Sequence, residues 1–492
     1  MEKRNNIELH FTTRHAKDNK AMIIGFFKGT DSGKGGGPAK RCVIAGAGRV
    51  GQSIARELVR FGFDVVMLEK DPATAANLER ALDVKIINDN VLSTEALKSA
   101  ITEAPDFFVA VTESDEVNLV ACLLAQKLGA KKKAARIRNE EWFSDEFFTP
   151  ESLGLDMVIH PEEETVRHIE QVLTIYGAFD YSEVASGDAS LIGFEAPEGL
   201  PILGAPLAKV KEEFALDAFL IIGILREGDF FVPSGADCIM SGDRIWILTA
   251  KETEPFVMAI FRKKDGKPVS RLVVLGASLI GMKLAEDFSE KGASVILVEN
   301  DPETAKMAAA RLEKVEVMNI HLENEPEFLL DLDPGAIDCF VAASGDNKDN
   351  MMMSLLAKKL GVGKVVVVTS ETTYLPVLDS IGLDIVINPH NITAGKILSS
   401  MRKGMIQSVI TLREGVADLL EFFVEPGARL DGVKLSGAGF PRGAIAGMMI
   451  RGEDLVIPDG ATEFRAGDRV IVVAPREKMA AVEKLFVHKG LI

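Results

Sequence analysis

The chain has 492 residues, with 56 Lys and Arg against 73 Asp and Glu, so its formal net charge at pH 7 is −17. This length exceeds what one hydrophobic core supports and predicts about three or four domains. The acidic balance argues against a nucleic-acid partner, since phosphate backbones are bound by clustered Lys and Arg, and it disfavours direct adhesion to anionic lipid. No apolar run approaches the roughly 20 residues that span a bilayer, and no signal peptide is apparent. The cysteines lie on apolar patterns without a CxxC pair, so we expect reduced core residues in a soluble cytosolic protein.

Residues 1–39 carry mixed charge with little hydrophobic periodicity, and they end in a Gly- and Lys-rich run. Such a composition offers no continuous apolar face to bury. We therefore predict a flexible N-terminal extension over 1–39.

The stretch 41–71 carries the main motif. An apolar strand pattern is followed by the turn GAGRVG, an amphipathic helix pattern and a second apolar strand pattern that stops at Glu69. In the turn, Gly46 would make the tight bend, Gly48 would let the backbone approach a pyrophosphate, and Gly51 would allow close helix–strand contact. The phosphates would lie on the free N–H groups of the helix N-terminus.

The acidic residue Glu69 lies 23 residues after Gly46, close to where dinucleotide-binding proteins place the carboxylate that binds the adenosine ribose. A carboxylate at this position would repel a 2′-phosphate, which favours NAD(H) over NADP. The stretch therefore predicts a dinucleotide or adenine-nucleotide site; the alternative is a relic of the fold that holds no nucleotide.

The pattern continues with helices at 72–82, 93–100 and 118–128 and strands at 85–88, 106–112 and 133–138. Strands that alternate with helices of about ten residues predict a parallel sheet with right-handed connections. The loops at the carboxyl ends of such strands form the rim over which a nucleotide lies. These loops carry Asp89, Thr112, Arg136 and Arg138.

From 182 to 251 the pattern changes. Short strands at 221–225, 230–232 and 244–249 are separated by Gly, Pro and Asp turns, with one helical piece near 207–214. We predict a small α+β module here.

The chain then repeats itself. Gly276, Gly281 and Glu299 lie 230 residues after Gly46, Gly51 and Glu69, and later segments recur with offsets of 228 and 225. The fold class is therefore α/β, with two Rossmann-like, doubly wound parallel sheets that are each followed by a small α+β module. The expected boundaries are 40–160 and 270–388 for the nucleotide folds, and 161–255 and 389–492 for the helix crossovers with their modules.

The second turn differs from the first, because Ser278 stands where the first has Gly48 and Leu279 where it has Arg49. A side chain at the serine position would crowd a pyrophosphate, and the lost guanidinium would remove a charge-assisted phosphate contact. We therefore predict a weak, altered or empty second site, although Glu299 keeps ribose binding plausible.

No motif supplies a reactive group. The histidines do not form HExxH and lie near no Cys pair, so neither catalytic residues nor a metal site are predicted. A dehydrogenase would need an acid or base beside the nicotinamide, and neither small module offers a cluster of such residues. A protein with two nucleotide folds and no reactive group most simply binds the nucleotide as a signal that shifts a conformational equilibrium.

Together these motifs resemble the TrkA family, the cytosolic NAD-binding regulatory subunits of bacterial Trk potassium-uptake systems, which are built of tandem RCK domains (TrkA-N plus TrkA-C, twice). The resemblance covers residues 40–490 and is carried by GAGRVG, the VMLEKDP strand end, the segments AVTESDEVNLVACLLA at 110–125 and ARIRN at 135–139, and the repeated small modules. The long N-terminal extension and the altered second turn depart from the family's pattern.

The resemblance implies which residues hold the nucleotide. In the first repeat they are Gly46, Ala47, Gly48, Arg49, Val50, Glu69, Thr112, Glu113 and Arg136. In the second they are Gly276, Ala277, Ser278, Leu279, Ile280, Glu299 and Ser344.

The resemblance also implies a location and partners. Family members form homo-oligomeric rings, dimeric or tetrameric, on the cytoplasmic face of a membrane subunit resembling TrkH or TrkG, and NAD(H) and possibly ATP or ADP gate ion flow through it. We therefore expect a non-enzymatic, peripheral regulatory subunit on the inner face of the cell membrane. Two alternatives stay open: an NAD-dependent oxidoreductase with duplicated domains, and an RCK-type regulator of another cation transporter.

Overall fold

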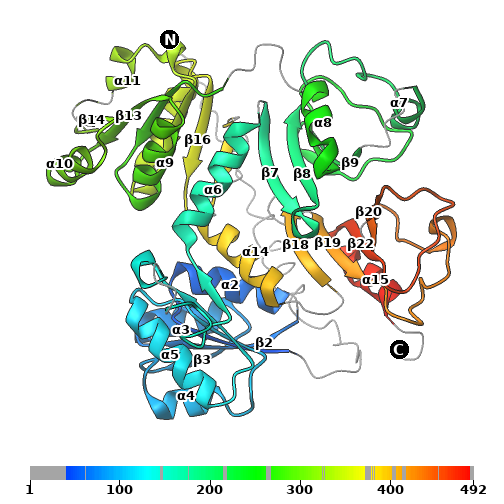
Figure 1. The fold of residues 1–492 in the computed structure, drawn as a ribbon, viewed down its shortest axis with the longest axis horizontal. Helices are drawn as coiled ribbons and strands as arrows, with labels where there is room; N and C mark the ends of the chain where they lie inside the picture. Colours follow the sequence, from blue (N-terminus) through cyan, green and yellow to red (C-terminus); the bar gives the residue numbers. More distant parts are fainter. Residues whose placement is uncertain are drawn as a thin grey trace, which may run out of the picture. The chain divides into compact units, whose positions relative to one another are not determined.

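The first repeat builds a parallel sheet from alternating strands and helices (Figure 1). The computed structural model describes residues 40–60, 62–143, 148–175, 177–213, 219–261, 268–323, 325, 327–371, 378, 381, 383–401, 406–412, 417–452 and 454–487, and the predicted extension 1–39 lies outside them. The strands are β1 (Arg41–Ala45), β2 (Asp64–Glu69), β3 (Lys85–Asn88), β4 (Phe107–Ala110), β5 (Lys132–Arg136) and β6 (Met157–Ile159). Between them run α2 (Arg49–Arg60), α3 (Pro72–Ala81), α4 (Thr94–Ala100) and α5 (Asp115–Lys127). The order β3-β2-β1-β4-β5-β6 confirms the predicted doubly wound sheet.

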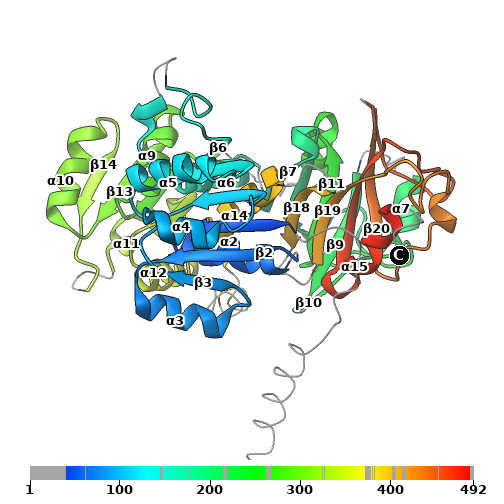
Figure 2. The ribbon, with the colours of Figure 1, turned by 90° about the horizontal axis from the view of Figure 1, so that it is seen from below.

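Alternate residues of this sheet face opposite helix layers, as the pleat requires. Ile44 of β1 packs in one core with Leu58 of α2, and the neighbouring Val43 packs in another with Leu97 of α4. Figure 2 shows α3 and α4 on opposite sides of the sheet. The strands are therefore buried on both faces, which explains why they read as continuous apolar runs.

The second repeat forms a sheet of the same kind. Its strands are β12 (Arg271–Leu275), β13 (Ser294–Glu299), β14 (Glu316–Asn319), β15 (Cys339–Ala342), β16 (Lys364–Val368) and β17 (Ile385–Ile387). Its helices are α9 (Leu279–Glu290), α10 (Pro302–Arg311), α11 (Phe328–Asp331) and α12 (Asn347–Lys359). The order β14-β13-β12-β15-β16-β17 matches that of the first sheet, so the repeat in the sequence is a repeat in the fold.

The helix that follows each sheet packs on the sheet of the other repeat. Helix α6 (Pro161–Thr174) follows β6, yet its Ile169 lies in the same core as Leu284 of α9. Helix α14 (Pro389–Met401) follows β17, and its Ile397 lies in the core of the first sheet beside Leu58 of α2. Figure 1 shows α14 beside α2. Each sheet is thus completed by a helix from the other repeat.

Each small module is an antiparallel sheet. The first contains β7 (Ala178–Val184), β8 (Ala189–Glu195), β9 (Phe219–Arg226), β10 (Asp229–Phe231) and β11 (Arg244–Ala250), with α7 (Leu207–Glu213) and α8 (Glu254–Phe261). The second contains β18 (Ile406–Leu412), β19 (Ala417–Phe423), β20 (Ile445–Arg451), β21 (Asp454–Val456) and β22 (Arg469–Pro475), with α15 (Arg476–Phe486). The orders β10-β9-β11-β8-β7 and β21-β20-β22-β19-β18 are equivalent. The strands predicted near 221, 230 and 244 are β9, β10 and β11, whereas β7 and β8 were not predicted individually.

The two modules share one apolar core. Trp246 and Leu248 of β11 pack in a single cluster with Leu419 of β19 and Ile471 of β22. A side chain at Gly447 would approach the Leu248 methyl group to 2.9 Å, so the backbone of β20 lies against the first module. An absent Cβ is what permits this approach.

The cysteines are free thiols. Cys42, Cys122 and Cys339 are buried, as predicted, and burial raises the pKa of the Cys122 and Cys339 thiols to about 12. Cys238 differs, because it is partly exposed. Within the described residues, no helix has both the length and the apolar character needed to cross a bilayer.

Candidate functional site

The glycine turn between β1 and α2 has little room for side chains at its two ends. Gly46 has φ +101°, and a Cβ on it would lie 3.0 Å from the backbone nitrogen of Thr112. A Cβ on Gly51 would lie 2.1 Å from the Gly46 carbonyl oxygen, so the first turn of α2 packs directly on the loop. Gly48 differs from both, because its Cβ would meet no atom within 4 Å and the residue is exposed. The turn therefore presents bare backbone to open space at the position where a pyrophosphate is expected.

The carboxylate of Glu69 accepts hydrogen bonds from backbone N–H groups of the glycine turn and of the residues after β2. Its Oε2 accepts a hydrogen bond from the Ala47 N–H at 2.9 Å, and its Oε1 accepts one from the Asp71 N–H at 2.8 Å. Each carboxylate oxygen has a second lone pair, so these bonds leave capacity to accept from ribose hydroxyls. The predicted ribose-binding residue is thus placed next to the glycine loop.

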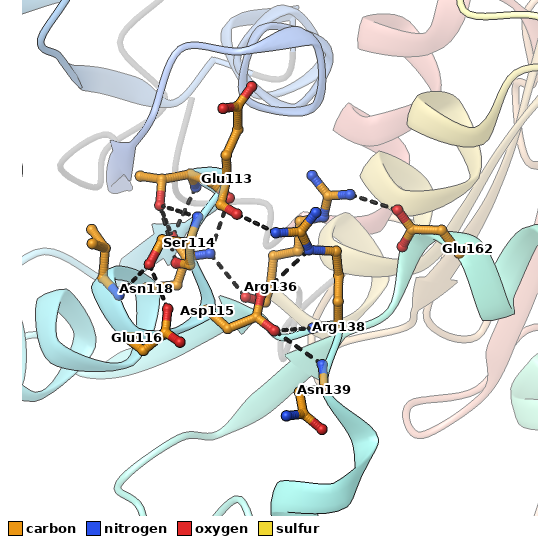
Figure 3. Close-up of polar contacts among 11 residues, drawn as sticks. Glu113, Ser114, Asp115, Glu116, Asn118, Arg136, Arg138, Asn139 and Glu162 are labelled. Carbon is orange, nitrogen blue, oxygen red and sulfur yellow. Dashed lines mark hydrogen bonds and ion pairs between the residues drawn. The ribbon is translucent and has the colours of Figure 1, made fainter. Parts of the chain in front are cut away.

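A buried asparagine joins the ends of β4 and β5. Asn118 is 0% exposed, and its Oδ1 accepts from the Thr112 N–H at 2.8 Å and from the Thr112 hydroxyl at 2.7 Å. Its Nδ2 donates to the carbonyl oxygens of Thr112 at 3.1 Å and Arg136 at 2.9 Å (Figure 3). Asn118 therefore fixes the distance between Thr112 and Arg136.

The two arginines predicted at this rim have different partners (Figure 3). Arg136 donates from Nη2 to Oε1 of Glu162, on α6, at 2.6 Å. Its Nε is buried and has no hydrogen-bond partner among the described residues. Arg138 instead closes the loop after β4: it donates to the Glu113 carbonyl, and its own N–H donates to Asp115 at 2.8 Å.

The carboxyl ends of β1 and β4 meet at the point where the strand order reverses, which is where doubly wound sheets bind ligands. The structure brings the glycine turn, Glu69 and Thr112 together there. Asp89 follows β3, which β2 separates from β1, and its carboxylate accepts from the Asn90 N–H at 2.7 Å. Glu113 is exposed, and its backbone carbonyl accepts a hydrogen bond from Arg138.

The second turn keeps this geometry with one difference. Ala277 and Asp301 donate to Glu299 at 2.6 and 2.9 Å, and Ser344 is bound by Asn350 in the way Thr112 is bound by Asn118. The predicted crowding by Ser278 takes another form. Its hydroxyl donates to the Ala343 carbonyl at 2.6 Å and accepts from the Gly281 N–H at 3.2 Å, so the side chain caps α9 and occupies one of its free amides.

A cavity of about 410 Å³ lies on this second turn, and residues from both repeats line it. The first repeat contributes Arg49 and Glu162, and the second contributes the Ser278 loop, Ser344 and His390. We call it the inter-repeat pocket. Arg49 donates to the Ser370 hydroxyl at 2.6 Å and lies 3.7 Å from the Glu371 carboxylate. The Arg49 guanidinium, which was predicted to serve the first turn, therefore contacts the second repeat. The second turn has no guanidinium of its own at the equivalent position, which is Leu279.

Sequence reasoning missed two positions of the candidate site. Asn118 lies inside the TESDEVN segment but was not assigned a role; its recurrence as Asn350 in the same hydrogen-bonding pattern was the available signal. Glu162 carried no local signal, because it follows the first sheet and reaches Arg136 only through the fold. Among the described residues, no group of three or more His, Cys, Asp or Glu side chains is placed to hold a metal ion.

Comparison with known proteins agrees with this geometry. The TrkA-N domain model matches residues 42–161 and 272–389, and the TrkA-C domain model matches 419–487. The Trk system potassium uptake protein TrkA of Haemophilus influenzae is 28% identical over 453 residues, which cover 91% of this chain and 98% of that protein. A TrkA homolog of Archaeoglobus fulgidus is 30% identical over 447 residues, covering 91% and 100%.

Solved structures show the same fold. The GsuK channel bound to NAD aligns with a TM-score of 0.57 at 14% identity, covering 91% of this chain and 79% of that one. The GsuK RCK domain aligns with a TM-score of 0.55 at 15% identity, covering 91% and 95%. The tandem RCK architecture is therefore confirmed. With the TrkA-N model matched twice, the TrkA-C model matched once and a 30% identical relative covered over its full length, the chain belongs to the TrkA family.

Proposed function

We propose that this protein is a non-enzymatic, nucleotide-sensing regulatory subunit of a potassium-uptake system, and that it binds NAD(H) at the first glycine turn. The observation that carries the proposal is the exposed Gly48, which lies between two sterically obligatory glycines and follows Ala47, whose N–H is bound by Glu69. An open stretch of backbone at a helix N-terminus suits a pyrophosphate. The names of the TrkA relatives and the NAD-bound GsuK channel support the same choice of system and ligand.

Helices α6 and α14, which pack on the sheets of the opposite repeats, could couple ligand binding to a conformational change. Helix α2 begins at the glycine turn, and it packs against α14 from the second repeat. Arg136 at the rim is bound to Glu162 on α6, which packs in the core of the second sheet. A ligand that moves α2 or engages Arg136 would therefore change contacts in both repeats at once. If it binds one arrangement of the repeats more tightly than another, it shifts the equilibrium between them.

The test of the site is Gly48→Glu in the full chain, with NADH binding measured by calorimetry. The new side chain has open space, and a carboxylate near a helix N-terminus is favourable, so we expect an unchanged melting temperature. It would occupy the pyrophosphate position and repel the phosphates, so we expect NADH binding to be lost. Gly437→Glu is the matched control, because Gly437 is also exposed, has its nearest contact at 4.0 Å, and lies in the second module. Unchanged NADH binding in Gly48→Glu would contradict the assignment.

The membrane partner in this proposal is a potassium-translocating subunit resembling TrkH or TrkG, bound at the inner face of the cell membrane by a homo-oligomer of this chain. An acidic protein complements cytoplasmic loops that carry excess Lys and Arg. The test is pull-down from membranes with NADH or with ATP present, followed by flux through the recovered partner. Recovery of a different cation transporter would replace potassium in the proposal, and turnover of NADH by the purified protein would favour an oxidoreductase.

A further inference from the structure

Both terminal nitrogens of the Arg49 guanidinium are directed at the second repeat. Arg49 is the first residue of α2; its Nη1 donates to the Ser370 hydroxyl at 2.6 Å, and its Nη2 lies 3.7 Å from the Glu371 carboxylate. Ser370 and Glu371 follow β16. A phosphate that binds a guanidinium through two N–H groups needs at least one terminal nitrogen. In this structure both of those nitrogens already face another partner.

The acceptor for Arg49 is positioned by contacts within the second repeat. The Ser370 N–H donates to Oδ1 of Asn347 at 3.1 Å, and Nδ2 of Asn347 donates back to the Ser370 hydroxyl oxygen at 3.0 Å. Asn347 begins α12, so this reciprocal pair joins the helix to the segment after β16. The hydroxyl oxygen that receives Arg49 is therefore held in place from its own side.

The first repeat fills the equivalent position with an arginine of its own. Ser370 is the counterpart of Arg138, because each lies two residues after the strand residue whose carbonyl is bound by the buried asparagine of its repeat. Arg138 donates to the Glu113 carbonyl, and its Nε lies 3.5 Å from the Asp115 carboxylate. An arginine at position 370 would repel Arg49. The second repeat instead has a small hydroxyl there and receives its guanidinium from the first repeat.

We propose that Ser370 and Glu371 compete with the nucleotide at the first glycine turn for the guanidinium of Arg49. The ligand-free chain then keeps this contact between the repeats, and a bound nucleotide releases it. Glu371 would repel a phosphate bound to the same guanidinium, so the two anions are not held together. The inference rests on the proposed function in taking the first turn to hold NAD(H), and it names a contact between the repeats that depends on whether that site is occupied.

The competing contact should lower the affinity for NADH without abolishing it. The side chains of Arg49 and Glu371 are 63% and 42% exposed, so their attraction is screened by water and salt. Removing an exposed ion pair of this kind by Glu371→Gln should raise NADH affinity by about two- to fivefold. Ser370→Ala removes a charge-assisted hydrogen bond and should raise the affinity by about three- to tenfold.

The experiment measures NADH binding to the full chain by calorimetry as a double-mutant cycle. Ser370→Ala and Glu371→Gln are each made with Arg49 present and with Arg49→Gln. We expect both to raise NADH affinity when Arg49 is present and to have no effect when it is replaced. Glu170→Gln is the matched control, because Glu170 on α6 bonds to Lys291, which follows α9, and so removes an ion pair that involves neither glycine turn. Its NADH affinity should equal that of wild type.

Two results would overturn the inference. Unchanged or weaker NADH binding in both Ser370→Ala and Glu371→Gln would exclude competition, and weaker binding would mean that the guanidinium serves both partners at once. Equal effects with and without Arg49 would exclude its guanidinium as the shared group. In either case the proposed function stands if wild type binds NADH and Gly48→Glu does not. Absence of NADH binding by the wild-type chain would overturn both.

Discussion

Replacing Asn118 by alanine should loosen the rim of the first site by an amount that the structure sets. The side chain is 0% exposed and makes hydrogen bonds to the Thr112 N–H, hydroxyl and carbonyl and to the Arg136 carbonyl. The hydroxyl can rotate to another acceptor, so truncation leaves three backbone groups without partners. At about 1–3 kcal/mol for each unsatisfied buried group, the local loss is roughly 3–9 kcal/mol, and the lower value applies if water enters.

Hydrogen exchange read by mass spectrometry is the suitable assay, because a chain with several domains need not unfold in a single transition. A local loss of about 3 kcal/mol corresponds to exchange at Thr112 that is faster by roughly two orders of magnitude. NADH affinity at the first turn should fall as well, since Asn118 positions Thr112 and Arg136.

Asn350→Ala is the matched control. It removes the equivalent bonds to the Ser344 N–H, hydroxyl and carbonyl and to the Val368 carbonyl. Exchange should then increase around Ser344, while the Thr112 segment and NADH binding at the first turn stay as in wild type. The reasoning is refuted if Asn118→Ala changes exchange at Thr112 by less than about threefold, or if both variants affect both segments equally.

Two further outcomes follow from single contacts. Gly51→Ala places a methyl group 2.1 Å from the Gly46 carbonyl, so we expect a melting temperature several degrees lower, whereas Gly437→Ala, in open space, should have no such effect; equal melting of the two variants would contradict the close packing. His390, whose pKa is lowered to about 4, stays neutral in the folded chain while the unfolded chain takes up a proton near pH 6.5. Stability is therefore lost as the pH falls from 6.5 towards 4, by up to about 3 kcal/mol. His390→Gln should reduce this loss in acid-denaturation curves, and His321→Gln should not; identical curves for wild type and His390→Gln would rule the histidine out.

Much of the candidate site could be predicted from the sequence because its geometry is local. The conformation of Gly46 and the packing of Gly51 on the Gly46 carbonyl are set within six residues of chain. Glu69 reaches the Ala47 N–H because neighbouring parallel strands end at one edge of the sheet, and the strand patterns already implied this. The direction of a long side chain is not set locally: the guanidinium of Arg49, which stays a predicted nucleotide contact at its own turn, donates a hydrogen bond to Ser370 of the second repeat.

The sequence by itself determined the glycine turns, the acidic strand ends, the alternation of strands and helices and the duplication, since each depends on neighbours in the chain or on recurrence at a fixed offset. Only the tertiary structure decided which sheet each crossover helix completes. The apolar faces of α6 and α14 are buried in the cores of the opposite repeats, and periodicity identifies a buried face without identifying what buries it. That choice brings Arg49, Glu162 and His390 into one pocket, although they are far apart in the chain and carry no common motif.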